Sequence, residues 1–195
     1  MYRKTMTAVG LALCAGTAGF LAISQGPENT ELSAGNGFSI QVDLSDRQLS
    51  VMSNGEVTGT YDVAVGAPSF PTPEGSFTVK RIIWNPRWVP PDSKWAKNKI
   101  PREPGDPKNP MGKVKIFFRE PDYYIHGTRE VDSLGQAESH GCIRMRNSEA
   151  VELARMVMTH GGVGQPDSWF QRVINRVRST HSVRLARPVP VTIVS

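Results

Sequence analysis

The chain has 195 residues, and its 23 Lys and Arg against 18 Asp and Glu give a formal net charge of +5. Hydrophobic residues make up 38% and charged residues 21%, a balance that excludes a wholly disordered chain and a membrane protein with several spans. Two cysteines exclude a scaffold held by several disulfides. The 18 glycines and 15 prolines favour short strands joined by turns over a helical bundle.

The first 24 residues have the pattern of an export signal. Arg3 and Lys4 form a short basic segment, and residues 6–23 carry no charge. Small residues at 22–24 suit cleavage by a signal peptidase. We therefore expect residues 1–24 to be a signal peptide, with an uncleaved N-terminal membrane anchor as the alternative. Cleavage leaves Cys142 as the one remaining cysteine, and a lone thiol in an oxidising compartment calls for burial or a chemical role.

Residues 25–37 have the composition of a tether, and alternating apolar residues begin directly after it. The alternation predicts strands over residues 38–43 and 48–52. Asn54-Gly55 predicts a tight turn that leads into a strand through residues 61–65. A turn at residues 71–75 precedes a strand at 77–80. This meander of short strands is typical of a sandwich or barrel.

Residues 84–112 lack periodicity and contain seven prolines together with Trp84, Trp88 and Trp95. So long an irregular stretch inside a compact domain favours a lid or binding loop. Between Lys80 and Arg119 there are eleven basic residues and three acids, which suits an anionic or saccharide-containing partner. A merely solvated basic loop is the alternative. Nucleic acid is not expected, because the chain is predicted to be exported and carries no recognition motif.

The C-terminal part alternates between strands and helices. Strands are expected over residues 113–118 and 122–125, and a final strand over 189–194. A helix is expected over 148–160, with Ser148 as its cap and Gly161-Gly162 at its end. A second helix is expected over 168–177.

Two motifs carry the candidate chemistry: His-Gly-Thr at residues 126–128 and Ser-His-Gly-Cys-Ile-Arg at 139–144. A thiol is mostly protonated near neutrality, so Cys142 needs a base to act as a nucleophile. His126, at the end of a predicted strand, is a better base than His140, which is too close in sequence to aim at the sulfur. The Gly127 carbonyl can accept the Nδ1 proton of His126 and so fix its tautomer.

Two further features suit acyl transfer. The backbone N–H groups of Gly141 and Cys142 can form an oxyanion hole. Arg144 supplies positive charge for a substrate carboxylate and favours the thiolate. A zinc site built from His126, His140 and Cys142 is the competing interpretation, but it lacks the usual ligand spacing.

These motifs resemble the active-site pattern of the L,D-transpeptidases, the YkuD-type domain. The resemblance extends to residues 66–68 with 71–77, to Asn-Pro-Met-Gly at 109–112, and to the closing segment at 188–191. It covers residues 38–195, which we predict to be the catalytic domain. It implies a mainly β fold of two curved mixed β-sheets with a few short helices.

By the same resemblance, Cys142 is the nucleophile, His126 the base and Gly127 the group that orients it. The implied substrate is the peptidoglycan stem peptide. Cys142 attacks the bond before the terminal D-alanine, and the resulting thioester passes to an amine of a second stem. Substrate-binding roles are implied for Ser139, His140, Arg144, Trp84 and Trp88. Some members carry Asn where this chain has Arg144, so roles of that Asn are not transferred.

Alternatives remain at the level of sequence. Water as acceptor would make the protein a peptidase or amidase, and a protein amine would make it an enzyme that anchors envelope proteins. A non-catalytic wall-binding module is the third interpretation. We expect an exported protein of the periplasm or cell wall that acts as a monomer and needs no metal or organic cofactor.

Overall fold

The computed structural model describes residues 37–176 and 178–195. The predicted signal peptide and all but the last residue of the predicted tether lie outside the described residues. Among the residues that are described, no helix is long and apolar enough to cross a membrane.

The first three strands form an antiparallel meander, as the alternation predicts. They are β1 (Phe38–Asp43), β2 (Gln48–Ser53) and β3 (Glu56–Asp62). Asn54 and Gly55 both have positive φ, at 52° and 85°, the backbone conformation of the tight turn predicted there. The prediction of one continuous strand through residues 61–65 is wrong, because the chain leaves one sheet and enters another within this segment. β3 ends at Asp62 and β4 (Val65–Gly66) begins a second sheet, because buried Ala64 pairs instead with Arg144.

The remaining elements are β5 (Gly75–Trp84), β6 (Val114–Arg119), β7 (Tyr123–Thr128), β8 (Ala137–Ser139), β9 (Ile143–Arg146), α1 (Asn147–His160), α2 (Asp167–Asn175) and β10 (His181–Val194). β10 begins eight residues before the predicted strand, and its pairing with β5 is irregular between Arg184 and Val189. Ser148 is not the cap of α1, because the helix already begins at Asn147 after Arg146.

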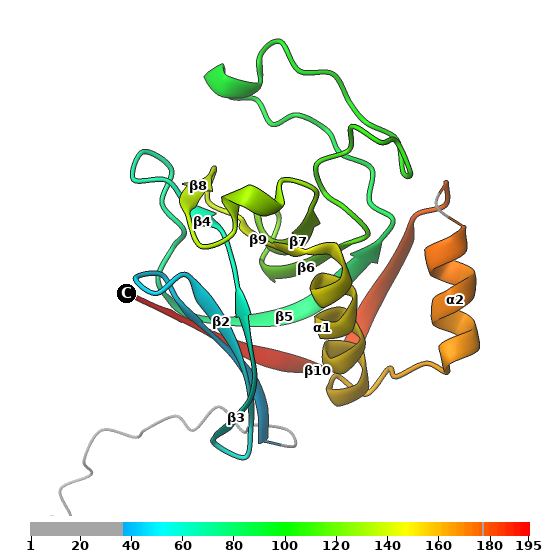
Figure 1. Cartoon of the computed structure of the whole chain (residues 1–195). Coiled ribbons are helices and arrows are strands. Elements are labelled where there is room, and N and C mark those ends of the chain that lie inside the picture. Colours follow the sequence, from blue (N-terminus) through cyan, green and yellow to red (C-terminus); the bar gives the residue numbers. More distant parts are fainter. Residues whose placement is uncertain (1–36, 177) are drawn as a thin grey trace, which may run out of the picture. The chain divides into compact units, whose positions relative to one another are not determined.

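The strands form one eight-stranded and one two-stranded sheet, which confirms a mainly β fold with few helices; the large sheet is mixed as predicted, whereas the small sheet is a single parallel pair. The large sheet has the order β3-β2-β1-β10-β5-β6-β7-β9, and the small sheet pairs β4 with β8. The pairs β1–β10, β7–β9 and β4–β8 are parallel, and the others are antiparallel. Figure 1 shows the curvature of the sheet behind α1.

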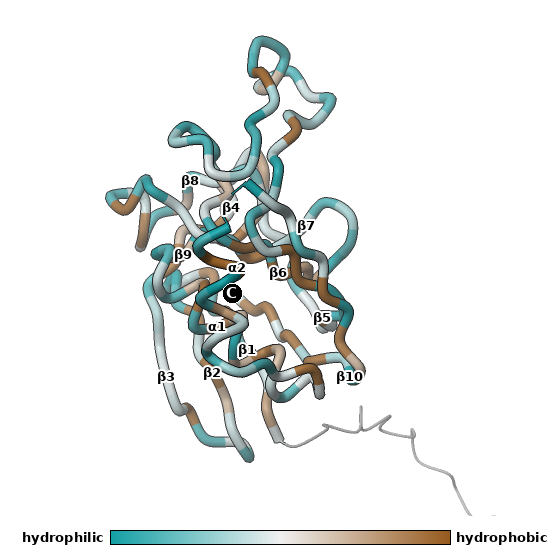
Figure 2. The backbone as a smooth tube through the Cα atoms, turned by 90° about the vertical axis from the view of Figure 1, so that its right-hand side faces the viewer, coloured by the Kyte–Doolittle hydropathy of each residue, from teal (hydrophilic) through white to brown (hydrophobic). Residues whose placement is uncertain are grey.

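The core lies between the large sheet and α1, which contacts β6, β7, β9 and β10. Its buried face carries Ala150, Leu153, Ala154, Val157 and Met158. Each fully buried Leu, Val or Met side chain contributes about 1.5–3 kcal/mol relative to exposure. Figure 2 shows that hydrophobic residues are concentrated on the strands inside the domain and that the outer loops are mostly hydrophilic.

Trp84 belongs to this core, so its predicted contact with substrate is wrong. Its side chain is 0% exposed. The ring packs against Phe170 and Trp169 of α2, with centroids 5.6 and 6.2 Å away. A large aromatic side chain at the end of β5 is thus used to attach α2 to the sheet.

Residues 85–113, between β5 and β6, form the irregular proline-rich loop that the sequence predicts. It contains one short 3-10 helix, η2 (Lys94–Ala96), and extends beyond the end of the sheet that holds β7 and β9 (Figure 1). Trp88 and Arg102 pair through their backbones and hold its two arms together. Buried Asn109 donates to the carbonyls of Pro86 and Glu103. The loop is therefore ordered by internal hydrogen bonds.

Candidate active site

Two parallel neighbouring strands bring Cys142 and His126 together. In the register of β7 and β9, Ile125 faces Ile143 and His126 faces Arg144. Cys142 directly precedes β9 and so lies beside Tyr124, near the start of β7. Both residues line one cavity of about 590 Å³, together with Trp88, Trp95, Lys115 and Tyr124.

His126 is a buried neutral imidazole. Its side chain is 3% exposed, and Nδ1 lies 2.9 Å from the carbonyl oxygen of Gly127. Because a carbonyl can only accept, Nδ1 carries the proton and Nε2 is left as an acceptor. Burial lowers the pKa of His126 to about 3, partly opposed by hydrogen bonds to the backbone of Gly127 and Pro110. The Gly127 carbonyl thus lies within hydrogen-bond distance of Nδ1, where the sequence analysis expects its acceptor.

The Cys142 thiol is in a mixed environment. Sγ donates to the carbonyl oxygen of Asp122 at 3.4 Å, and within the described residues no hydrogen bond joins it to His126. Burial raises the pKa of Cys142, while hydrogen bonds from Tyr124 and the charges of Lys115 and Arg144 lower it. The resting side chain is therefore a thiol whose ionised form is supported by three neighbours.

The turn over residues 139–142 is held by Ser139. Its hydroxyl donates to the Cys142 carbonyl at 2.5 Å and accepts the Gly141 N–H at 3.1 Å. Gly141 has φ +99°, and a Cβ there would lie 2.9 Å from the Tyr123 ring. Ser139 is 1% exposed, so its hydroxyl fixes the turn. The Gly141 N–H, predicted for the oxyanion hole, is already used inside the turn.

Asn147 is a positioning residue that the sequence does not single out. Its Nδ2 donates to the Thr128 carbonyl at 3.0 Å, and its Oδ1 accepts the Lys113 N–H at 3.2 Å. A Cβ on Gly127 would lie 2.2 Å from this Oδ1, and one on Gly112 would lie 2.0 Å from it. Both glycines therefore let Asn147 join the ends of β6 and β7 behind Gly127.

His140 faces the proline-rich loop. Its ring stacks on Trp95 and also contacts Phe70 at a centroid distance of 4.7 Å. Trp88, predicted as a substrate contact, lines the cavity and is 7% exposed. The sequence marks Trp95 only as one aromatic residue of the proline-rich loop, and no signal in its neighbours identifies His140 as its partner.

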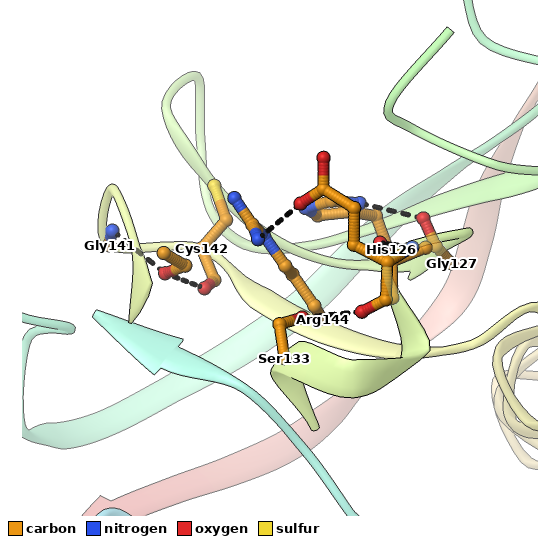
Figure 3. Close-up of polar contacts among 9 residues, drawn as sticks. His126, Gly127, Ser133, Gly141, Cys142 and Arg144 are labelled. Carbon is orange, nitrogen blue, oxygen red and sulfur yellow. Dashed lines mark hydrogen bonds and ion pairs between the residues drawn. The ribbon is translucent and has the colours of Figure 1, made fainter. Parts of the chain in front are cut away.

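Arg144 lines the same cavity and is engaged in an ion pair. Its Nη1 lies 2.9 Å from Oε2 of Glu130, whose side chain is 71% exposed (Figure 3). An exposed carboxylate is an exchangeable partner, since such pairs contribute only about 0–1 kcal/mol.

The zinc interpretation has no support in the geometry. In residues 37–176 and 178–195, no three His, Cys, Asp or Glu side chains are grouped so that they can hold a metal ion. The His140 ring is stacked on Trp95 instead.

Solved structures show where this fold occurs. The catalytic domain from an E. faecium L,D-transpeptidase matches with a TM-score of 0.53 at 20% identity, over 82% of this chain and 98% of that one. L,D-transpeptidase 3 from Mycobacterium tuberculosis matches with a TM-score of 0.52 at 16% identity, over 82% of this chain and 61% of that one. At such identities the likeness is one of fold.

Sequence comparison gives the family. The chain is 36% identical over 121 residues to the putative L,D-transpeptidase YqjB of Bacillus subtilis, covering 60% of this chain and 64% of that protein. It is 32% identical over 120 residues to the putative L,D-transpeptidase YkuD of the same organism, covering 62% and 60%. The chain thus spans less than two thirds of the length of these relatives. The sequence model of the L,D-transpeptidase catalytic domain, YkuD, matches residues 37–191, and the chain therefore belongs to this family.

Proposed function

We propose that the protein is an L,D-transpeptidase of peptidoglycan stem peptides, with Cys142 as nucleophile and His126 as base. The observation that carries the proposal is the pairing of β7 with β9. It places a neutral histidine, fixed by the Gly127 carbonyl, in the same cavity as the thiol. A nucleophile, a base and a group that orients the base are the parts that acyl transfer needs.

In the first half-reaction, the Cys142 thiol gives its proton to Nε2 of His126. The sulfur attacks the carbonyl carbon of the third stem residue, and the bond to the terminal D-alanine breaks. D-alanine leaves with the proton from His126, and a thioester remains on Cys142. The Cys142 N–H is the donor that we assign to the oxyanion, because the Gly141 N–H already binds Ser139.

In the second half-reaction, a side-chain amine of another stem attacks the thioester. His126 takes the proton of the amine and returns it to the Cys142 sulfur, so that the enzyme is regenerated and the cross-link is formed. The proline-rich loop, with Trp88 and Trp95 on the cavity, limits the access of water to the thioester.

The alternatives keep the same acyl-enzyme and change the acceptor. Water gives a shortened stem, and an envelope-protein amine gives an anchored protein. Since peptidoglycan lies outside the cytoplasmic membrane, we propose that the protein acts in the periplasm or cell wall after export through residues 1–24. We propose that it acts as a monomer.

The test is incubation of the purified protein with a disaccharide-tetrapeptide, followed by mass spectrometry of protein and products. We expect a dimer that lacks one D-alanine and an acyl adduct on Cys142. Cys142→Ala removes both, and His126→Gln slows acylation by about 10²–10⁴-fold. Tripeptide without dimer would identify water as the acceptor. Turnover by Cys142→Ala would exclude Cys142 as the nucleophile.

A further inference from the structure

Three adjacent strands place a cation beside the proposed nucleophile and base. Lys115 on β6 is paired with His126 on β7, and His126 is paired with Arg144 on β9. Residues paired across strands point to the same face of a sheet, and Tyr124, two residues before His126, shares that face. All four side chains line the cavity that also contains Cys142.

The cations near this face differ in their partners. Arg144 pairs with Glu130 at 2.9 Å, and Arg81, which faces Phe117 on β6, pairs with Glu120 at 2.9 Å. Lys115 has no carboxylate partner within the described part of the chain. Its Nζ lies 4.4 Å from the centroid of the Tyr124 ring, a cation–π contact. Lys99 on the proline-rich loop lines the cavity and also has no carboxylate partner within the described part of the chain, but Lys115 is the one of the two that lies on the sheet, paired with His126.

The electrostatics of the site require such a charge. Burial keeps His126 neutral and lowers its pKa to about 3, so an imidazolium beside a resting thiolate is disfavoured. Burial and the nearby charge of Arg81 lower the pKa of Lys115 to about 8, and the negative charge of an ionised Cys142 partly opposes this lowering. The Lys115 charge in turn lowers the pKa of Cys142. The two charged forms therefore stabilise each other.

We propose that Lys115, held on the ring of Tyr124, is the cation that stabilises the thiolate of Cys142, and that the Tyr124 hydroxyl supports it by a hydrogen bond. Lys115 keeps its proton throughout, and the thiol proton goes to His126 or to solvent. The proposal rests on the proposed function only in taking Cys142 as the nucleophile.

The test is the pH dependence of Cys142 alkylation by iodoacetamide between pH 5 and 10. It is read by mass spectrometry on the peptide that contains Cys142, so that Cys14 does not contribute. We expect Lys115→Met to raise the apparent pKa of the thiol by about one unit, which slows alkylation about tenfold at pH 7. Lys115→Arg keeps the charge, so its profile is expected to follow the original one up to about pH 8, the pKa of Lys115 itself. Tyr124→Phe keeps the ring and gives a smaller upward shift.

The matched control is Lys80→Met, an exposed position on β5, which leaves the profile unchanged. The other titratable and charged residues around the thiol are unchanged in the Lys115 variants, so a shift in the profile is attributed to position 115. These residues are Tyr124, His126, Arg144, Arg81, Asp122, Glu130, His140 and Lys99. Circular dichroism checks folding, and Lys115→Gln repeats the test if the Met variant is unfolded.

Two outcomes would overturn the assignment. One is an unchanged profile in a folded Lys115→Met protein. The other is a Lys115→Arg profile that matches that of Lys115→Met, which would assign a neutral amine instead of a cation. Alkylation needs no peptide, so a shifted profile without cross-linked product would reject the proposed function and keep this inference.

Discussion

Trp95 stacks on the imidazole of His140, with ring centroids 3.8 Å apart and ring planes 22° apart. The two residues are 45 positions apart in the chain: Trp95 lies in the proline-rich loop, and His140 lies in the turn that presents Cys142. The Lys99 ammonium lies 5.4 Å from the Trp95 ring and its charge contributes, after burial, to lowering the pKa of His140. One aromatic contact therefore couples the position of the loop to the nucleophile turn.

Replacing Trp95 tests this coupling. Stacked aromatic pairs contribute about 0.5–1.5 kcal/mol beyond burial, so Trp95→Ala releases the loop with little effect on the sheet. We expect a rise in KM for the stem peptide of about tenfold and faster hydrogen exchange in residues 85–113. Lys97→Ala, exposed next to η2, serves as the control. An unchanged KM with faster exchange would mean that the stack orders the loop without serving the substrate.

The buried neutral state of His126 predicts how stability depends on pH. Its pKa is about 3 in the folded protein against an ordinary value of 6.5. Between these values the unfolded chain binds a proton that the folded chain does not. The free energy of unfolding therefore falls as pH drops from about 6.5 towards 3, by up to about 1.4 kcal/mol per pH unit from this group. His126→Gln removes this contribution, so urea unfolding at pH 7, 6, 5 and 4 gives a flatter profile. Parallel profiles would contradict the buried neutral state.

The close packing behind Gly127 predicts a strong response to one methyl group. Gly127→Ala puts a Cβ 2.2 Å from Asn147 Oδ1, so the Asn147 bridge or the Gly127 carbonyl must shift. We expect a loss of about 1–3 kcal/mol in the free energy of unfolding, and slower acylation because His126 is no longer held. Gly59→Ala on β3, whose Cβ would meet nothing closer than 3.5 Å, is the matched control.

A double variant separates the two effects. In Gly127→Ala with Asn147→Gly the contact with Oδ1 is gone and the contact with the Cα of residue 147, at 3.2 Å, remains, so the losses are expected to be smaller than the sum of the single losses. Strict additivity, measured by urea unfolding of all four proteins, would show that Gly127 and Asn147 act independently.

The Arg144–Glu130 pair predicts opposite effects from its two members. If Arg144 binds a substrate carboxylate, Glu130 is the group that the substrate displaces. We expect Arg144→Gln to raise KM about tenfold, since a charge-assisted hydrogen bond contributes about 1.5 kcal/mol, and Glu130→Gln to lower it. Neither change moves the melting temperature by more than a few degrees, because the Glu130 side chain is largely exposed to solvent. Equal rises in KM for both variants would show that the pair itself, and not free Arg144, serves the site.

Much of the fold was predictable from local sequence. The alternation over residues 38–53, the Asn54-Gly55 turn and the periodic helix before Gly161-Gly162 are all present, since each depends on neighbours within a few residues. The bounds of two strands were predicted wrongly because they depend on distant partners. β10 extends beyond the apolar residues at its end because β5 pairs with its exposed part, and β3 ends before Ala64, which pairs with Arg144.

The candidate chemistry of this protein can be read from its sequence. Cysteine, histidine and glycine in two short motifs predict a nucleophile, a base and an acceptor for the Nδ1 proton of that base, because these roles depend on residue type. The neighbours of these residues are known only from the fold. In the structure, Trp84 is buried in the core, Ser139 and Asn147 hold the backbone by hydrogen bonds, and Lys115 is paired with His126. Each of these placements depends on strand register or on packing between distant segments, and such contacts leave no local pattern in the chain.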